Sequence, residues 1–153
     1  MSRILFQLLI LGLLVSLLSS CSTAPRYSAG TPKWSTTVKK GKQTYPKVQY
    51  GISSFYGEDF HGKTTANGEV FDMYGLTAAH KTLPLNTIIR VTNLENNKSL
   101  ILRINDRGPY VKGRILDCSY GAALKLGFVG QGTARVKIEV IELGDDEYMK
   151  RKS

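Results

Sequence analysis

The feature that most limits what this chain can fold into is an alternation of apolar and polar residues between residues 48 and 143. It occurs in four short segments, residues 48–56, 87–92, 99–105 and 134–143. Alternation of period two predicts half-buried β-strands. A short helix is expected before the last strand, with Ser119 as its N-cap and Gly127 as its C-cap. Several short strands with one or two short helices predict a mainly β domain, a small barrel.

The first twenty residues are expected to be a signal peptide. Arg3 precedes an apolar run over residues 4–18, which has signal-peptide length and is short for a membrane-spanning helix. The sequence Leu-Ser-Ser-Cys ending at Cys21 resembles the lipobox of bacterial lipoproteins. The resemblance implies cleavage before Cys21 and acylation of its thiol. The alternative is an ordinary secretory signal with an incidental cysteine.

Lipidation implies a location and a partner, namely the cell envelope and a membrane reached through the N-terminal lipid. Ser22 stands where an Asp would indicate inner-membrane retention in Gram-negative bacteria, so the resemblance indicates the outer membrane, facing the periplasm. With Cys21 acylated, Cys118 has no intramolecular disulfide partner. We expect it to be a small buried hydrophobic residue.

The formal charge of +9 lies mainly on the extensions of the domain. Residues 21–47 carry six basic residues and no acidic one, lack apolar periodicity, and are predicted to be a flexible basic tether. Residues 144–153 are predicted to be a charged, frayed tail. Such segments attract anionic polymers or surfaces, or simply act as a solvated tether. An exported protein is not expected to bind nucleic acid.

Two acidic residues occupy turns where a cleft is expected. Glu69 follows the tight turn Asn67-Gly68, and Asp106 begins the turn D-R-G-P at the end of a predicted strand. Two carboxyl groups in different environments that face one cleft are what cleavage of a glycosidic bond requires. Alternatively, Asp106 only accepts backbone hydrogen bonds and Glu69 is solvated. The histidines and Cys118 do not have metal-ligand spacing, so neither a metal nor a cofactor is expected.

Six stretches resemble the rare lipoprotein A (RlpA) family of septal-ring lytic transglycosylases. They follow one another over residues 50–143 as G-I-S-S-F-Y-G, F-H-G-K-T-T-A-N-G-E-V-F-D, L-T-A-A-H-K-T-L-P, R-V-T-N-L, R-I-N-D-R-G-P-Y and G-R-I-L-D-C-S-Y-G-A-A. The resemblance implies a six-stranded double-psi β-barrel over residues 48–143. It also implies endolytic cleavage of MurNAc–GlcNAc bonds in peptide-stripped glycan strands of peptidoglycan, leaving 1,6-anhydro-MurNAc ends.

The same resemblance implies catalytic roles for Glu69, His80 and Asp106. Asp117 is a secondary catalytic candidate, because expansins and one class of endoglucanases carry an aspartate at a similar place. Phe55 replaces a usual Trp, which would weaken a sugar-stacking platform, and Cys118 stands where Leu is common.

No peptidoglycan-binding SPOR repeat follows the domain, so septal targeting is expected only through recruitment by division proteins. The protein is expected to be a monomer. Two other functions compete with the enzyme: a non-catalytic, expansin-like peptidoglycan-binding lipoprotein, and a structural link between membrane and wall.

Overall fold

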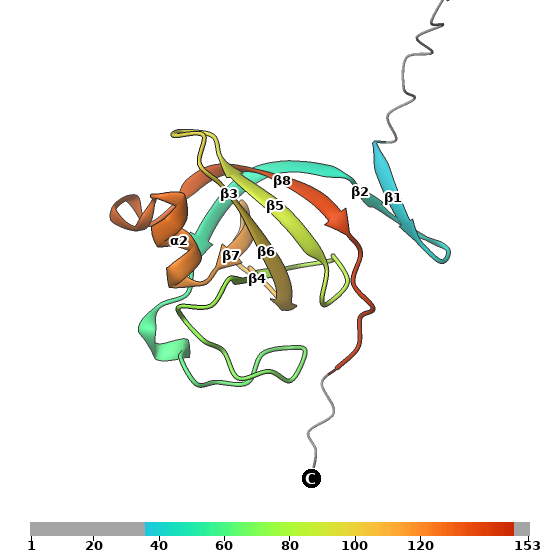
Figure 1. The fold of residues 1–153 in the computed structure, drawn as a ribbon, viewed down its shortest axis with the longest axis horizontal. Helices are drawn as coiled ribbons and strands as arrows, with labels where there is room; N and C mark the ends of the chain where they lie inside the picture. Colours follow the sequence, from blue (N-terminus) through green and yellow to red (C-terminus); the bar gives the residue numbers. More distant parts are fainter. Residues whose placement is uncertain (1–35, 149–153) are drawn as a thin grey trace, which may run out of the picture. The chain divides into compact units, whose positions relative to one another are not determined.

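The computed structural model describes residues 36–148, which form a closed six-stranded barrel preceded by a two-stranded hairpin (Figure 1). The strands of the barrel are β3 (Val48–Phe55), β4 (Thr77–His80), β5 (Ile88–Asn93), β6 (Ser99–Asp106), β7 (Arg114–Cys118) and β8 (Ala134–Glu142). Around the barrel they lie in the order β3-β7-β4-β6-β5-β8. The pairs β3–β7 and β4–β6 are parallel and the others are antiparallel. The predicted β-barrel is therefore confirmed.

One α-helix, α2 (Tyr120–Leu126), and two 3-10 turns, η1 (Glu58–Phe60) and η2 (Val129–Gln131), complete the described elements. The predicted caps of the helix are both present. The side chain of Ser119 accepts a hydrogen bond from the Ala122 N–H at 3.1 Å, and Gly127 has φ +75 at the C-cap. Among residues 36–148, no helix is long and apolar enough to cross a membrane.

Strands β4 and β7 were not predicted from the alternation of the sequence. In β4, Ala78, Ala79 and His80 are all buried, and β7 ends with three consecutive buried residues, Leu116 to Cys118. A strand that is enclosed on both faces shows no period of two, because its polar and apolar side chains are both covered. These two strands lie side by side and carry part of the candidate site.

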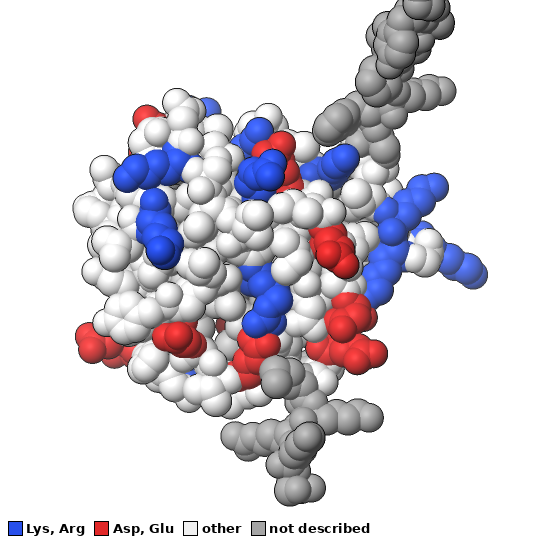
Figure 2. Space-filling view, viewed as in Figure 1, with Lys and Arg blue, Asp and Glu red and all other residues white. Residues whose placement is uncertain are grey.

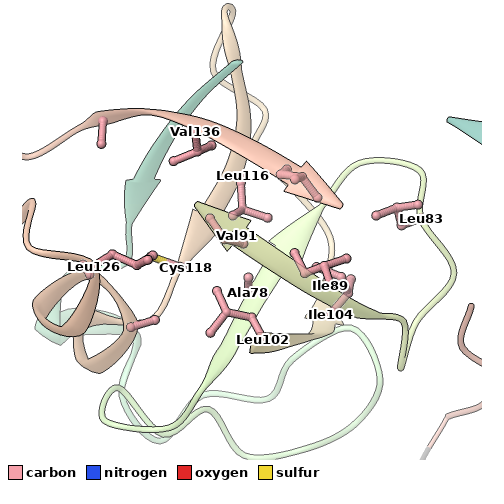
Figure 3. Packing of buried hydrophobic residues seen from close by; sticks show 14 of the residues in the cluster. Ala78, Leu83, Ile89, Val91, Leu102, Ile104, Leu116, Cys118, Leu126 and Val136 are labelled. Atoms are coloured by element: carbon pink, nitrogen blue, oxygen red, sulfur yellow. The ribbon is translucent and has the colours of Figure 1, made fainter. Parts of the chain in front are cut away.

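Aliphatic side chains from all around the barrel fill its interior. Leu102, Ile104, Leu116 and Val136 are at most 1% exposed and meet inside the barrel (Figure 3). Full burial of such a side chain contributes roughly 1.5–3 kcal/mol to folding. Cys118 belongs to this cluster, as expected, and burial raises the pKa of its thiol to about 12.

The expectation of a flexible tether up to Lys47 is corrected by the hairpin β1 (Thr37–Lys40) and β2 (Gln43–Pro46). Tyr45 is 9% exposed and joins the hydrophobic core, and Val38 packs against it. These are long-range contacts, so the local composition does not reveal them. Cys21 and the signal segment lie outside the described residues.

The beginning of the expected frayed tail is also held in place. Gly144 N–H donates to Thr87 Oγ1 at 3.0 Å, and Asp146 Oδ1 accepts the Leu85 N–H at 2.8 Å. The structure therefore attaches residues 144–147 to the turn before β5 rather than leaving them free.

In the view of Figure 2, basic side chains cover the hairpin region, and acidic side chains gather along the lower edge of the molecule.

Residues 56–76, which connect β3 to β4, form long loops at one end of the barrel (Figure 1). Helix α2 fixes the last part of this connection, because Gly121 N–H donates to Met73 O at 2.8 Å. A Cβ atom on residue 121 would lie 2.5 Å from the carbonyl oxygen of Tyr74. Only glycine permits this close approach of loop and helix.

We therefore expect Gly121→Ala to destabilise the domain by about 1–3 kcal/mol, although alanine is the better helix former. Gly130→Ala is the matched control, because a Cβ atom there has no atom within 4 Å. Urea denaturation of both variants measures the difference. Equal stability of the two would show that the loop shifts away from the helix at little cost.

Candidate active site

Two carboxyl groups lie on one face of the barrel wall, on the two strands that flank β4, at the loop-bearing end of the barrel. Asp106 ends β6 and Asp117 lies in β7, and both are register partners of Ala79 in the intervening strand β4. Register partners on neighbouring strands project to the same side of a sheet. Two strand spacings place their Cα atoms roughly 10 Å apart. The structure thus brings together the main candidate Asp106 and the secondary candidate Asp117.

Tyr56 connects this pair. Its hydroxyl donates a hydrogen bond to Asp106 Oδ2 at 3.0 Å, and its backbone N–H donates to the carbonyl of Cys118, the neighbour of Asp117, at 3.0 Å. Burial, followed by the charge and hydrogen bond of Asp106 and the charge of Asp117, raises the pKa of Tyr56 far above its ordinary value. The phenol therefore stays protonated and remains a donor to Asp106.

The other oxygen of Asp106 holds two backbone groups. Oδ1 accepts the N–H of Ala66 and the N–H of Arg107, both at 2.8 Å. Ala66 belongs to the loop of residues 62–71, so the carboxyl group clamps this loop to the end of β6. A cavity of about 30 Å³, room for about one water molecule, adjoins Asp106. It is lined by Tyr56, Phe60, Lys63, Thr64, Thr65, Phe71 and Asp106.

Asp117 has a different environment. Its Oδ1 atom is buried and has no hydrogen-bond partner, and Arg114 Nε lies 3.6 Å away, which is an ion-pair distance too long for a hydrogen bond. Burial raises the pKa of Asp117, although the charges of Arg114 and Lys81 act in the opposite direction. A carboxyl group whose pKa is raised can keep a proton and donate it to a leaving oxygen.

Glu69 does not share this environment. Its two carboxylate oxygens accept hydrogen bonds from Arg103 Nη1 and Nη2 at 2.7 and 2.9 Å, and Asn105 Nδ2 donates to it at 3.0 Å. Partial burial favours the neutral carboxyl, but the hydrogen bonds from Arg103 and Asn105 outweigh it and lower the pKa of Glu69. Arg103 and Asn105 belong to β6, the strand that Asp106 ends, so Glu69 binds near the same end of that strand.

Glu69 therefore differs from Asp106 in its partners, which are a guanidinium and a side-chain amide rather than backbone N–H groups and a phenol. Its catalytic role stays a prediction. What the contacts show is an anchor for the loop of residues 62–71, because Asn67 Oδ1 accepts both the Glu69 N–H at 3.2 Å and the Thr65 hydroxyl at 2.7 Å. That loop presents the Ala66 N–H to Asp106.

His80 is buried and organises the turn after β4. Its Nδ1 atom accepts the N–H groups of Thr82 and Leu83 at 3.2 and 3.1 Å. Burial, followed by the charges of Arg107 and Lys81, lowers the pKa of His80 to about 4. The imidazole is neutral near pH 7, with its proton on Nε2. Arg107 Nη1 donates to Leu83 O at 2.8 Å, so this turn braces the residue that follows Asp106.

Tyr56, Arg103 and Arg107 were not identified from the sequence as site residues. Tyr56 stands in the first family-like stretch, and Arg103 interrupts an apolar strand, so both carried a weak signal. Within the described range, no group of three His, Cys, Asp or Glu side chains is arranged to hold a metal ion.

Comparison with solved structures identifies the class of fold. A Streptomyces papain inhibitor matches with a TM-score of 0.51 and 17% identity, covering 62% of this chain and 94% of the inhibitor. An expansin from Clavibacter michiganensis in complex with cellohexaose matches with a TM-score of 0.51 and 12% identity, covering 62% and 50%. Identities this low show the shared fold alone, a double-psi β-barrel.

The family follows from the sequence comparisons. Residues 48–138 match the model of the lytic transglycolase family, and the chain belongs to that family. Three relatives bear the name endolytic peptidoglycan transglycosylase RlpA. They come from Pseudomonas aeruginosa (42% identical, 86% of this chain covered), Campylobacter jejuni (53%, 68%) and Vibrio cholerae (56%, 61%). The matches span 52%, 40% and 36% of these relatives.

The lowered pKa of His80 predicts a dependence of stability on pH. The unfolded chain binds a proton at His80 near the ordinary pKa of 6.5, whereas the folded chain binds it only near 4. Acidification across this window therefore lowers the free energy of unfolding, by at most about 3 kcal/mol from this residue. We expect His80→Asn to flatten the dependence.

Chemical denaturation at several pH values between 7 and 4 measures the slope. His61→Gln is the control, because His61 is exposed, and this variant should keep the slope of the unsubstituted protein. A slope unchanged in His80→Asn would mean that other groups cause the pH dependence.

Proposed function

We propose that this domain is an endolytic lytic transglycosylase that cleaves MurNAc–GlcNAc bonds in peptide-stripped glycan strands and leaves 1,6-anhydro-MurNAc ends. The observation that carries the proposal is the pair Asp106 and Asp117. They lie on one face of the two strands that flank β4. Tyr56 binds Asp106 through its hydroxyl and the residue after Asp117 through its backbone N–H, and the two carboxyl groups have different surroundings. Family membership and the printed names of the relatives support the reaction.

Asp117 is the proton donor in this mechanism, because burial favours its neutral form. Its proton passes to the glycosidic oxygen, the bond from that oxygen to C1 of the muramic acid breaks, and the electron pair stays on the leaving oxygen. The C6 hydroxyl oxygen of the same muramic acid then bonds to C1. Its proton passes to the Asp117 carboxylate, which restores the acid without consuming water. One carboxyl group thus acts first as acid and then as base.

Asp106 stabilises the positive charge that develops at C1 in the transition state. Its carboxylate is held in one orientation by Tyr56, Ala66 and Arg107, so no reorganisation is needed at the moment of reaction. Glu69 and His80 act as positioning residues. Glu69 fixes the loop that carries Ala66, and His80 fixes the turn that binds Arg107.

We expect Asp106→Asn and Asp117→Asn each to reduce the release of anhydro-sugar products at least a hundredfold, because each removes a charge or a proton that the transition state requires. Asp59→Asn, in the exposed turn η1, is the control and should keep full activity. Activity should also fall as the pH rises through the raised pKa of Asp117, because the acid form is then lost. Mass spectrometry of products from peptide-stripped strands measures all three variants.

Two outcomes would contradict this assignment. If Glu69→Gln abolishes turnover in a folded protein while Asp117→Asn keeps it, the acid is Glu69 and not Asp117. If strands are bound but the unsubstituted protein releases no anhydro product, the domain binds glycan without cutting it.

We further propose that acyl chains on Cys21 anchor the domain to the outer membrane, facing the periplasm, where it reaches the wall as a monomer. Support comes from the lipobox-like sequence and from Ser22. Each buried methylene contributes roughly 0.8 kcal/mol, so more than one chain gives stable anchoring. Recruitment by division proteins stays a prediction.

Cys21→Ser should yield protein that lacks acyl chains and leaves the membrane fraction after a high-salt wash. Cys118→Ala is the control, because it removes the other thiol and leaves Cys21 in place. Sedimentation of membranes and the mass of the intact protein measure both. An acylated or membrane-bound Cys21→Ser protein would show that the anchor lies elsewhere.

A further inference from the structure

A second hollow, of about 370 Å³, borders Tyr56 and plays no part in the mechanism above. One wall comes from the end of β3 and η1, and the other from the loop before β4 and from α2. The walls are formed by Phe55, Tyr56, Glu58, Met73, Tyr74 and Tyr120, and we call this hollow the aromatic groove. Its volume lies within the range of roughly 300–1,000 Å³ that is common for ligand sites.

The walls of the aromatic groove are held by contacts within the protein. The ring of Tyr120 packs edge-on against Phe55 at 5.9 Å and against Tyr74 at 6.2 Å between ring centroids. The Tyr74 N–H donates to Asp72 Oδ1 at 2.9 Å. The groove is therefore preformed, and a ligand would not have to order it.

The chemistry of the lining selects the ligand. Tyr74 is 65% exposed, so its ring offers an open apolar surface with a hydroxyl at its edge. A pyranose ring has the complementary character, an apolar face of C–H groups surrounded by hydroxyls, and packs on such a surface. The only charged group in the lining is the carboxylate of Glu58, and no Lys, Arg or His lies there. A ligand carboxylate in this groove would meet a like charge and no counter-charge.

We propose that the aromatic groove is a subsite for a neutral N-acetylglucosamine residue of the glycan strand, and that it excludes the lactyl carboxylate of N-acetylmuramic acid. The carboxylate of Glu58 accepts a hydrogen bond from a hydroxyl or the amide N–H of this sugar. The inference rests on the proposed function. The groove is a neighbour of the Asp106 carboxyl, because Tyr56 borders both.

The order of sugars in the strand agrees with this assignment. Muramic acid and N-acetylglucosamine alternate, so a muramic acid at Asp106 and Asp117 has N-acetylglucosamine on either side. The sugar in the groove is then the neighbour of the muramic acid whose bond breaks. The groove sets the register of the strand, and the two carboxyl groups act on the bond that this register presents.

The test uses chitotetraose, a neutral oligomer of N-acetylglucosamine, as a probe that does not depend on turnover. We expect Tyr74→Ala to weaken chitotetraose binding about tenfold and Tyr74→Phe to change it less than twofold, because the ring and not the hydroxyl supplies the stacking surface. Tyr50→Ala is the control. Tyr50 is 66% exposed, as exposed as Tyr74, but lies outside the groove, and its loss should have no effect.

Kinetics with peptide-stripped strands separate binding from chemistry. Tyr74→Ala should raise KM about tenfold and leave kcat near its original value, because a stacking contact serves the bound substrate and the transition state alike.

NMR titration with single sugars tests the selection by charge. N-Acetylglucosamine should perturb the signals of Tyr74 and Tyr120, and N-acetylmuramic acid should perturb them far less. Glu58→Gln should narrow this difference between the two sugars.

The outcomes distinguish this proposal from the reaction itself. If chitotetraose does not bind, or if Tyr74→Ala binds it as well as the control does, the groove is not a sugar subsite, even when anhydro products form. If N-acetylmuramic acid binds as strongly as N-acetylglucosamine, the selection by charge is wrong. If binding depends on Tyr74 but no anhydro product forms, the subsite stands and the proposed reaction fails.

Discussion

Three hydrogen bonds to the carboxyl group of Asp106 organise the functional end of this barrel. They join the end of β6 to the loop of residues 62–71 through Ala66, to the following turn through Arg107, and to the end of β3 through Tyr56. Each of these donors belongs to a different segment, so a single side chain sets the relative positions of all three. The loops can then be long and still present a fixed arrangement of polar groups to a substrate.

The carboxyl groups of the site differ in how far the protein satisfies them. Arg103 neutralises Glu69, and Asn105 donates a further hydrogen bond to it. Asp117, in β7, is buried with one oxygen that has no hydrogen-bond partner. A buried polar atom without a partner costs free energy. Such a cost is expected where a group must stay available to a substrate, and it supports the assignment of Asp117 rather than Glu69 as the acid.

The aromatic groove meets the cavity beside Asp106 at Tyr56. Tyr56 belongs both to its wall and to the hydrogen bonds of Asp106, so binding of a sugar and orientation of the carboxyl share one residue. Phe55, at the position where the resemblance implies a Trp, is half-buried against Tyr120 and Phe128. The more exposed ring of Tyr74 supplies the open stacking surface instead.

Local features of the sequence were enough to predict four strands, the helix with both caps, and the presence of Asp106 at a strand end. Alternation and capping depend on neighbours a few residues apart, and these are visible in the sequence. The order of the strands, the enclosed strands β4 and β7, and the hairpin of residues 37–46 were decided by tertiary structure. So were the partners of Glu69, His80 and Asp117. Whether a carboxyl group meets an arginine, a backbone N–H or nothing at all depends on segments far apart in the chain, and only the closed barrel brings those segments together.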